Sequence, residues 1–155
     1  MPTFVTGNMW DVFHDTEWFL ITTNPIINKQ GLAVMGRGIA KEAADRFPRL
    51  RLEFAEQLCQ RKLRESNVFT IGRYDGTRVG CFMVKNHWKE RARLDIIEKS
   101  VQDLLSTLAT ITDIRGYSPR VDLNFPGVGN GGLDKEDVRP LLMCLPDNVH
   151  IWSYE

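Results

Sequence analysis

The chain has 155 residues, and its 20 Lys and Arg side chains equal its 20 Asp and Glu side chains in number. A formally neutral protein has no general electrostatic attraction to nucleic acid or to membranes, so any anion-binding site has to be local. Hydrophobic residues make up 43% of the sequence, and a chain of this length can bury a real core. We therefore expect residues 1–155 to form a single domain.

The sequence also lacks the usual marks of membrane, secreted and metal-binding proteins. Its apolar runs are too short to span a bilayer, and its first ten residues lack the basic-then-apolar pattern of a signal peptide. The 3 cysteines are far apart and form no C-x-x-C pair, which favours reduced thiols in a cytoplasmic protein. The 3 histidines are dispersed as well. We expect a cytoplasmic monomer with no metal, no cofactor and no membrane partner.

Strand-like and helix-like segments alternate along the chain. Strands are predicted at 3–7, 18–23, 68–73, 79–85, 120–125 and 149–154. Helices are predicted at 38–48, 49–63, 94–110 and 134–145, with Pro140 near the start of the last one or kinking it. The segments 18–23 and 80–84 are almost wholly apolar, as expected for strands covered on both faces. This alternation predicts an α/β sandwich with a largely buried, mixed sheet.

Two glycine-rich loops each stand between a predicted strand and a predicted helix. The first ends in Gly36-Arg37-Gly38, and the second, "NFPGVGNGG" at 124–132, has four glycines in nine residues. A helix N-terminus offers unpaired N–H groups to phosphate, so two such loops can hold one diphosphate from both sides. Neither loop has the Walker A or the G-x-G-x-x-G pattern. The alternative is that both loops are simply tight turns.

Lys85 closes a predicted apolar strand, where an ammonium group is poorly placed unless it points into a cleft. Lys89, Arg91 and Arg93 follow it, and we expect their like charges to lower the Lys85 pKa, with partial burial lowering it further. A lysine with a lowered pKa can act as a nucleophile toward a masked carbonyl, such as the anomeric carbon of an opened sugar. The alternative is a strand-end lysine that reaches out to water.

The order of five segments resembles a macrodomain over nearly the full chain. These segments are "GNMWDVF", "TTNPIINKQGLAVMGRGIAKEAADRFP", "MVKNHW", "FPGVGNGGLDKEDVRPLL" and "VHIWSY". Within that superfamily, the lysine before "NHW" and the "GLDKEDVRPLL" segment resemble the branch that holds the terminal ADP-ribose glycohydrolase and the antitoxin that reverses DNA ADP-ribosylation. The resemblance implies a three-layer α/β/α sandwich with a central mixed, mostly parallel sheet. It also implies glycine loops that wrap the diphosphate and distal ribose of ADP-ribose.

The resemblance also implies a set of ADP-ribose-binding residues. They are Asn8, Met9, Asn24, Met35, Gly36, Gly38, Ile39, Gly127, Val128, Gly129, Asn130, Gly131 and Tyr154. Asn8 stands where macrodomains usually have the aspartate that binds the adenine amino group, so adenine selectivity is expected to be weaker. Asn24 matches the asparagine that faces the distal ribose, with the capping of a turn before Pro25 as the alternative. Tyr154 matches an aromatic residue at the adenosine end, although it can also simply pack.

Lys85 matches the catalytic lysine of the branch, and Asp134 is an uncertain substitute for its catalytic aspartate. The second loop is two residues shorter than in the glycohydrolase relatives, so Asp134 either reaches the ribose or caps the helix that follows. The resemblance therefore implies an enzyme that removes ADP-ribose from a DNA base or a protein carboxylate. In this scheme Lys85 attacks or stabilises the anomeric centre, and Asp134 or a water held by Asn24 completes hydrolysis.

Two other functions remain open on the sequence. A non-catalytic reader of ADP-ribose or a related nucleotide is favoured by the short second loop and opposed by Lys85. A hydrolase of a small derivative, such as ADP-ribose 1″-phosphate, fits the same residues. The basic stretch from Lys85 to Arg93, with Trp88 inside it, is a candidate contact for DNA and equally a solvated helix start.

Overall fold

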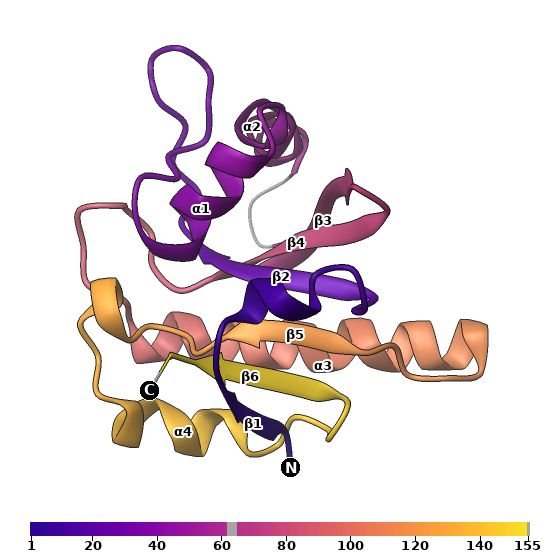
Figure 1. Cartoon of the computed structure of the whole chain (residues 1–155). Coiled ribbons are helices and arrows are strands. Elements are labelled where there is room, and N and C mark those ends of the chain that lie inside the picture. Colours follow the sequence, from indigo (N-terminus) through magenta and orange to yellow (C-terminus); the bar gives the residue numbers. More distant parts are fainter. Residues whose placement is uncertain (62–64, 155) are drawn as a thin grey trace.

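The computed structural model describes residues 1–61 and 65–154 (Figure 1). Its strands are β1 Thr3–Thr6, β2 Trp18–Thr23, β3 Val68–Tyr74, β4 Thr77–Met83, β5 Val121–Asn124 and β6 Val149–Ser153. Its α-helices are α1 Gly38–Arg46, α2 Leu50–Gln60, α3 Leu94–Arg115 and α4 Lys135–Leu142. Two short 3-10 helices, η1 Met9–Val12 and η2 Gly129–Gly131, complete the set.

The strands form one sheet in the order β1-β6-β5-β2-β4-β3. Every neighbouring pair is parallel except β3 and β4, which form an antiparallel hairpin. The mixed, mostly parallel sheet is therefore confirmed. Because β2 pairs in parallel with both β4 and β5, the carboxyl ends of these three strands meet at the same edge of the sheet.

Helices cover both faces of the sheet, and β2 contributes to the core on each side. Phe19 and Ile21 pack in one hydrophobic cluster with α1 and α2, whereas Trp18 and Leu20 pack in a second cluster with α3 and α4. Figure 1 shows α1 and α2 above β2, whereas α3 runs behind β5 and α4 lies beside β6 and β1. The three-layer arrangement is confirmed, and it explains why the first four residues of β2 are all apolar, since alternate side chains enter different cores.

The predicted elements all form. Some of them end at other residues than predicted, for physical reasons that the structure shows. The long helix α3 continues to Arg115 and ends at Gly116, which adopts the left-handed conformation at φ 79°. β4 ends at Met83, so Lys85 lies two residues past the strand that was expected to contain it. The predicted helix 49–63 is observed as far as Gln60, and residues 62–64 lie outside the described residues. The two 3-10 helices had no periodic signal to predict them.

None of the helices in the described ranges is both long and apolar enough to cross a membrane. All three cysteines are free thiols: Cys59 and Cys144 are exposed, and Cys81 is buried. Burial raises the pKa of the Cys81 thiol to about 12, so it behaves as an inert core residue. Across residues 1–61 and 65–154, no cluster of three or more His, Cys, Asp or Glu side chains is arranged to hold a metal ion.

Gly80 in β4 gives a direct test of the packing between sheet and core. A Cβ at this position would lie 2.5 Å from Trp18 Nε1, 2.7 Å from Leu20 Cδ2 and 2.7 Å from the backbone oxygen of Phe69. We expect Gly80→Ala to lower the free energy of unfolding by about 1–3 kcal/mol, because neither the strand backbone nor the core can move aside. Denaturant unfolding measures this change. Gly36→Ala is the control, since nothing lies within 4 Å of a Cβ there, and equal stability of the two variants would contradict the prediction.

Candidate functional site

Two adjoining cavities open where β2 and β5 end, between the two glycine loops. The first, which we call the lysine cavity, has a volume of about 400 Å³ and includes Lys85. The second, the tyrosine cavity, has about 410 Å³ and includes Tyr154. The residues common to both are Gly38, Ile39, Asn124, Val128 and Asn130. The cavities therefore form one elongated site with the glycine loops at its middle.

Thirteen of the fifteen residues proposed from the sequence line this site. The lysine cavity includes Asn24, Met35, Gly36, Gly38, Ile39, Lys85, Gly127, Val128, Asn130 and Gly131. The tyrosine cavity adds Met9, Gly129 and Tyr154. Asn8 and Asp134 line neither cavity. The structure thus brings together residues that are up to 145 positions apart in the sequence, from Met9 to Tyr154.

Glycine is present in the two loops for different physical reasons. Gly38, Gly127 and Gly129 have φ values of 58°, 78° and 64°, which side chains rarely adopt. A Cβ on Gly127 would also lie 2.7 Å from Ile97 Cδ1 in the core. For these positions the tight-turn interpretation holds. Gly36 is different: it has an ordinary backbone conformation, and an added Cβ would meet nothing within 4 Å, so its bare backbone simply faces the open cavity.

The start of α1 faces the lysine cavity, and its N-cap residue provides no side-chain cap. Arg37 is the N-cap residue in an extended conformation and makes no side-chain capping hydrogen bond. Gly38, Ile39 and Ala40, the first residues of the helix, all line the cavity. Unpaired N–H groups together with the positive end of the helix dipole favour an anionic ligand at this point.

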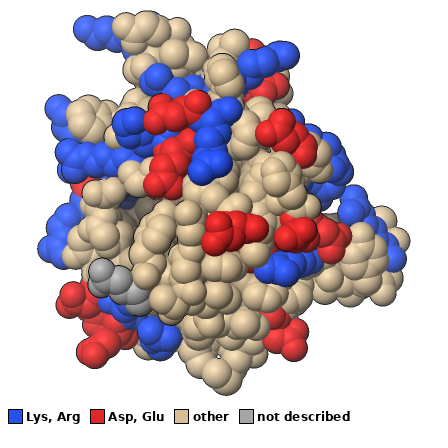
Figure 2. Space-filling model, viewed as in Figure 1, with Lys and Arg blue, Asp and Glu red and all other residues tan. Residues whose placement is uncertain are grey.

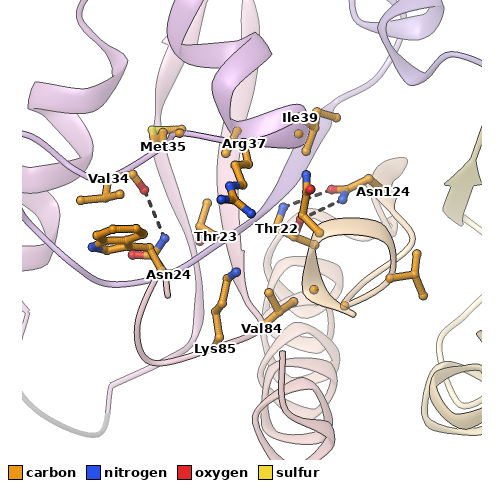
Figure 3. A pocket seen from close by; sticks show the side chains of 18 of the residues that line it. Thr22, Thr23, Asn24, Val34, Met35, Arg37, Ile39, Val84, Lys85 and Asn124 are labelled. Carbon is orange, nitrogen blue, oxygen red and sulfur yellow. Dashed lines mark hydrogen bonds between the residues drawn. The ribbon is translucent and has the colours of Figure 1, made fainter. Parts of the chain in front are cut away.

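A side-chain clamp joins the ends of β2 and β5 beneath the site. Asn124 Nδ2 donates to Thr22 Oγ1 at 2.8 Å, and the Thr22 backbone N–H donates to Asn124 Oδ1 at 3.1 Å (Figure 3). Both residues line the lysine cavity, and sequence reasoning missed them as site residues. Their position could have indicated a role in the site, because each lies in the last two residues of its strand and ligands bind at the carboxyl ends of parallel strands.

Asn24 is nearly buried, with 7% of its surface exposed, and it holds the first loop in shape. Its Nδ2 donates to the Val34 carbonyl at 3.2 Å, and its Oδ1 accepts from the Ile26 N–H at 3.0 Å. The second bond is an Asx-turn around Pro25, so the capping alternative is observed. The same side chain also lines the lysine cavity, and both of its polar groups can make one further hydrogen bond.

Lys85 and Arg37 extend toward each other across the lysine cavity (Figure 3). Lys85 is half-buried, and its Nζ donates to the Glu90 backbone oxygen at 3.3 Å. Burial is the main cause that lowers the pKa of Lys85, and the Arg37 guanidinium lowers it further, whereas Glu90 acts in the opposite direction. The predicted lowering is confirmed. The predicted source of the like charge was wrong, because Arg37 on the opposite loop supplies it.

The cations that follow Lys85 in the sequence interact with other groups. This explains why they do not supply the like charge that lowers the Lys85 pKa. Arg93 pairs with Asp95 at 2.8 Å, and Arg91 donates to the Gly132 backbone oxygen. Lys89 Nζ lies 5.1 Å from the centre of the Trp88 ring, which is itself 43% exposed and lines the lysine cavity. Figure 2 shows Lys and Arg along the left edge of the view, the side on which both glycine loops lie in Figure 1, and also at its top and right. The neutral chain therefore has local positive charge at the site, supplied by Arg37 and Lys85 in the lining of the lysine cavity.

Tyr154, which lines the tyrosine cavity, belongs to a small hydrogen-bonded aromatic group. Glu42 Oε1 accepts from Trp10 Nε1 at 2.8 Å and from the Tyr154 hydroxyl at 3.4 Å. Burial, followed by the Glu42 carboxylate, raises the pKa of Tyr154 above its ordinary value. Asn8 caps η1 by accepting the Trp10 N–H on its Oδ1 at 3.0 Å, and it is exposed. That oxygen is the acceptor expected to bind adenine, and here it already holds a backbone N–H.

Asp134 lies outside the elongated site. It is the N-cap residue of α4, with an extended backbone, but its side chain makes no capping hydrogen bond. It is exposed, and neither cavity includes it. The structure therefore places Asp134 at the helix start, as the capping alternative expected, without the capping bond. Its part in catalysis stays a prediction.

Comparisons with known proteins agree with this geometry. No family model matches the chain. The DNA ADP-ribosyl glycohydrolases of Mycobacterium bovis and Mycobacterium tuberculosis are each 31% identical to it over 95% of the chain. The chain spans 40% of the length of these relatives.

Solved structures give the same result. The macrodomain of Thermus aquaticus DarG matches with a TM-score of 0.69 and 26% identity, covering 100% of this chain and 98% of that one. The macrodomain of M. tuberculosis DarG matches with a TM-score of 0.70 and 28% identity over 98% and 97%. Thermosipho africanus DarTG in complex with ADP-ribose has a TM-score of 0.74 at 21% identity, covering 97% of this chain and 41% of that one.

The three-layer fold and the site between two glycine loops define the class of structure: the chain has the macrodomain fold. Within this class its sequence is similar to the macrodomains of DarG and to the DNA ADP-ribosyl glycohydrolases.

The electrostatics of Lys85 can be tested without any ligand. We expect Arg37→Gln to raise the pKa of Lys85, because a like charge is removed, and Glu90→Gln to lower it, because an opposite charge is removed. Titration of ¹³C-methylated lysines by NMR measures both changes, with the Lys85 signal identified by its loss in Lys85→Arg. Lys41, which pairs with Asp45 at 2.7 Å, is the internal reference. Shifts of the same sign in both variants would contradict the assigned causes.

Proposed function

We propose that this macrodomain binds ADP-ribose along the two cavities and removes it from ADP-ribosylated DNA. The adenosine occupies the tyrosine cavity, the diphosphate lies between the glycine loops, and the distal ribose lies in the lysine cavity. The start of α1 and the bare backbone at Gly36 support the placement of the diphosphate. The names of the similar proteins, which act on or bind ADP-ribosyl groups, support the choice of ligand.

The observation that carries the proposal is Lys85, a half-buried amine with a lowered pKa that points into the lysine cavity. A plain binding site for a diphosphate would favour a fully charged lysine. A lowered pKa increases the fraction of neutral amine, which is the nucleophilic form. This position suits chemistry at the anomeric carbon of the distal ribose, C1″, more than it suits binding alone.

The proposed reaction consumes one water. The neutral Nζ of Lys85 bonds to C1″ as the bond from C1″ to the base nitrogen breaks, and the departing base takes up a proton. Opening of the ribose ring then converts the adduct to an imine. Water, held by the remaining hydrogen-bonding capacity of Asn24, adds to the imine carbon and releases ADP-ribose and the free amine. Binding the ribose beside Lys85 supplies the orientation that the first step needs.

The free cysteines also bear on the cellular setting. Exposed free thiols at Cys59 and Cys144 suit a reducing compartment, so we place the protein in the cytoplasm. We also propose that residues 1–155 act as one domain and as a monomer.

Replacement of Lys85 tests the function. We expect Lys85→Ala to reduce ADP-ribose release from an ADP-ribosylated oligonucleotide by about 10² or more, the range for loss of a positioned catalytic group. Its melting temperature should stay near that of the wild type, because the ammonium makes one long hydrogen bond and no ion pair among the described residues. Release is followed by chromatography of free ADP-ribose.

Lys41→Ala is the matched control, since Lys41 is exposed on the outer side of α1 and lines neither cavity. Wild-type release by Lys85→Ala would refute the lysine mechanism. Tight ADP-ribose binding by a wild-type protein that releases none from DNA would favour the reader. Release from ADP-ribose 1″-phosphate alone would favour the small-molecule hydrolase.

Asp134→Asn tests the second catalytic candidate. We expect turnover to remain within about 3-fold of wild type, since the carboxylate is exposed and lines neither cavity. Steady-state kinetics on the same oligonucleotide measure this change. A loss of about 10² to 10⁴ would instead show that Asp134 acts as the acid or base.

A further inference from the structure

A third cavity adjoins Lys85. It has a volume of about 570 Å³, and we call it the Asn67 cavity. In the described part of the chain, Lys85 is the one residue that lines both this cavity and the lysine cavity. If C1″ of the bound sugar lies at Lys85, the bond to be broken lies at the boundary between the two cavities. The group that leaves then has an existing space on the far side of that boundary.

Part of the lining of the Asn67 cavity is apolar. Phe69 and Met83 are buried, with 8% and 6% of their surfaces exposed, and Ile27 and Ile96 are beside them in the lining. The Arg61 guanidinium lies over the Phe69 ring at 3.9 Å from its centre. Apolar side chains with a planar cation nearby form the kind of surface on which an unstacked nucleobase is held.

Two carboxamide groups in the lining have no partner within the described residues. The backbone of Asn67 is fixed, because its N–H donates to Asp103 and its carbonyl accepts from Met83, but no hydrogen bond involves its side chain. The Asn86 side chain is exposed and equally unpaired. A carboxamide offers a donor and an acceptor side by side, which matches the hydrogen-bonding edge of a base.

The charges around this cavity are largely neutralised by pairing. Lys99 pairs with Asp103 at 2.6 Å, Arg61 with Glu65 at 3.4 Å, and the partner of Asp95 is Arg93. A carboxylate side chain from a protein substrate would therefore meet cations that already have partners. A neutral, flat group with hydrogen-bonding edges fits this lining better.

We propose that the Asn67 cavity binds the nucleobase from which ADP-ribose is removed, with Asn67 and Asn86 contacting its edge. This inference rests on the proposed function, because it assigns the leaving group of that reaction. A base inside a cavity cannot remain stacked in a duplex, so the preferred substrate is a single strand or an extruded base. Recognition of the base is then separate from recognition of ADP-ribose.

The test compares two affinities of one inactive protein. In a Lys85→Ala background, calorimetry measures binding of free ADP-ribose and of a single-stranded oligonucleotide that carries one ADP-ribosylated base. We expect Asn67→Ala and Asn86→Ala together to weaken oligonucleotide binding about 10-fold, the effect of losing one or two hydrogen bonds. Binding of free ADP-ribose should be unchanged. Gln102→Ala, which removes an exposed carboxamide from α3 outside all three cavities, should change neither affinity.

The possible results separate this inference from the proposed function. Unchanged oligonucleotide binding in the double variant overturns the inference even if the wild type releases ADP-ribose. Equal losses for both ligands also overturn it, because the residues would then act through the fold. An equal loss for a peptide that carries ADP-ribosylated glutamate refutes the preference for a base. A wild type that releases no ADP-ribose refutes the proposed activity, while a selective loss on the oligonucleotide still supports the base site.

Discussion

The site depends on the parallel pairing of β2 with both β4 and β5, which brings three strand ends to one edge of the sheet. The two glycine loops and Lys85 all follow from these ends, and the Thr22–Asn124 clamp joins two of them. Buried cores on both faces hold the strands in register, so the positions of the strands set the distance between the loops. A chain with no net charge can build an anion site in this way, because backbone N–H groups and a helix N-terminus supply the positive potential.

The charged part of the site contains an unfavourable arrangement that a ligand can relieve. Arg37 and Lys85 point at each other across a cavity with no acidic side chain in its lining among the described residues. Their repulsion and the partial burial of Lys85 lower its pKa. A diphosphate near the start of α1 would interact favourably with the Arg37 guanidinium, whereas Lys85 would face the distal ribose. Arg37 can therefore contribute to anion binding, while the partial burial of Lys85, the main cause of its lowered pKa, favours the neutral, nucleophilic amine.

Local sequence patterns predicted most of the fold. The contacts between residues at the edge of the sheet could be identified only from the structure. Apolar runs and helical periodicity located every strand and α-helix, because burial on two faces leaves a clear signal. The glycine clusters located the loops, and Lys85 stood out as a cation after an apolar strand. The source of the charge next to Lys85 was misassigned, because sequence proximity favoured Lys89, Arg91 and Arg93, whose partners lie elsewhere in the fold. Arg37 is close to Lys85 only in space, as is Thr22 to its partner Asn124.

The most direct measurement is to trap the proposed imine. The protein is incubated with ADP-ribose and cyanoborohydride, which reduces an imine to a stable secondary amine, and the modified lysine is mapped by peptide mass spectrometry. If C1″ lies against the Lys85 amine, the adduct forms mainly on Lys85 and is suppressed by excess ADP. An adduct spread over exposed lysines such as Lys29, Lys41 and Lys89, with no effect of ADP, would contradict the placement of the ribose.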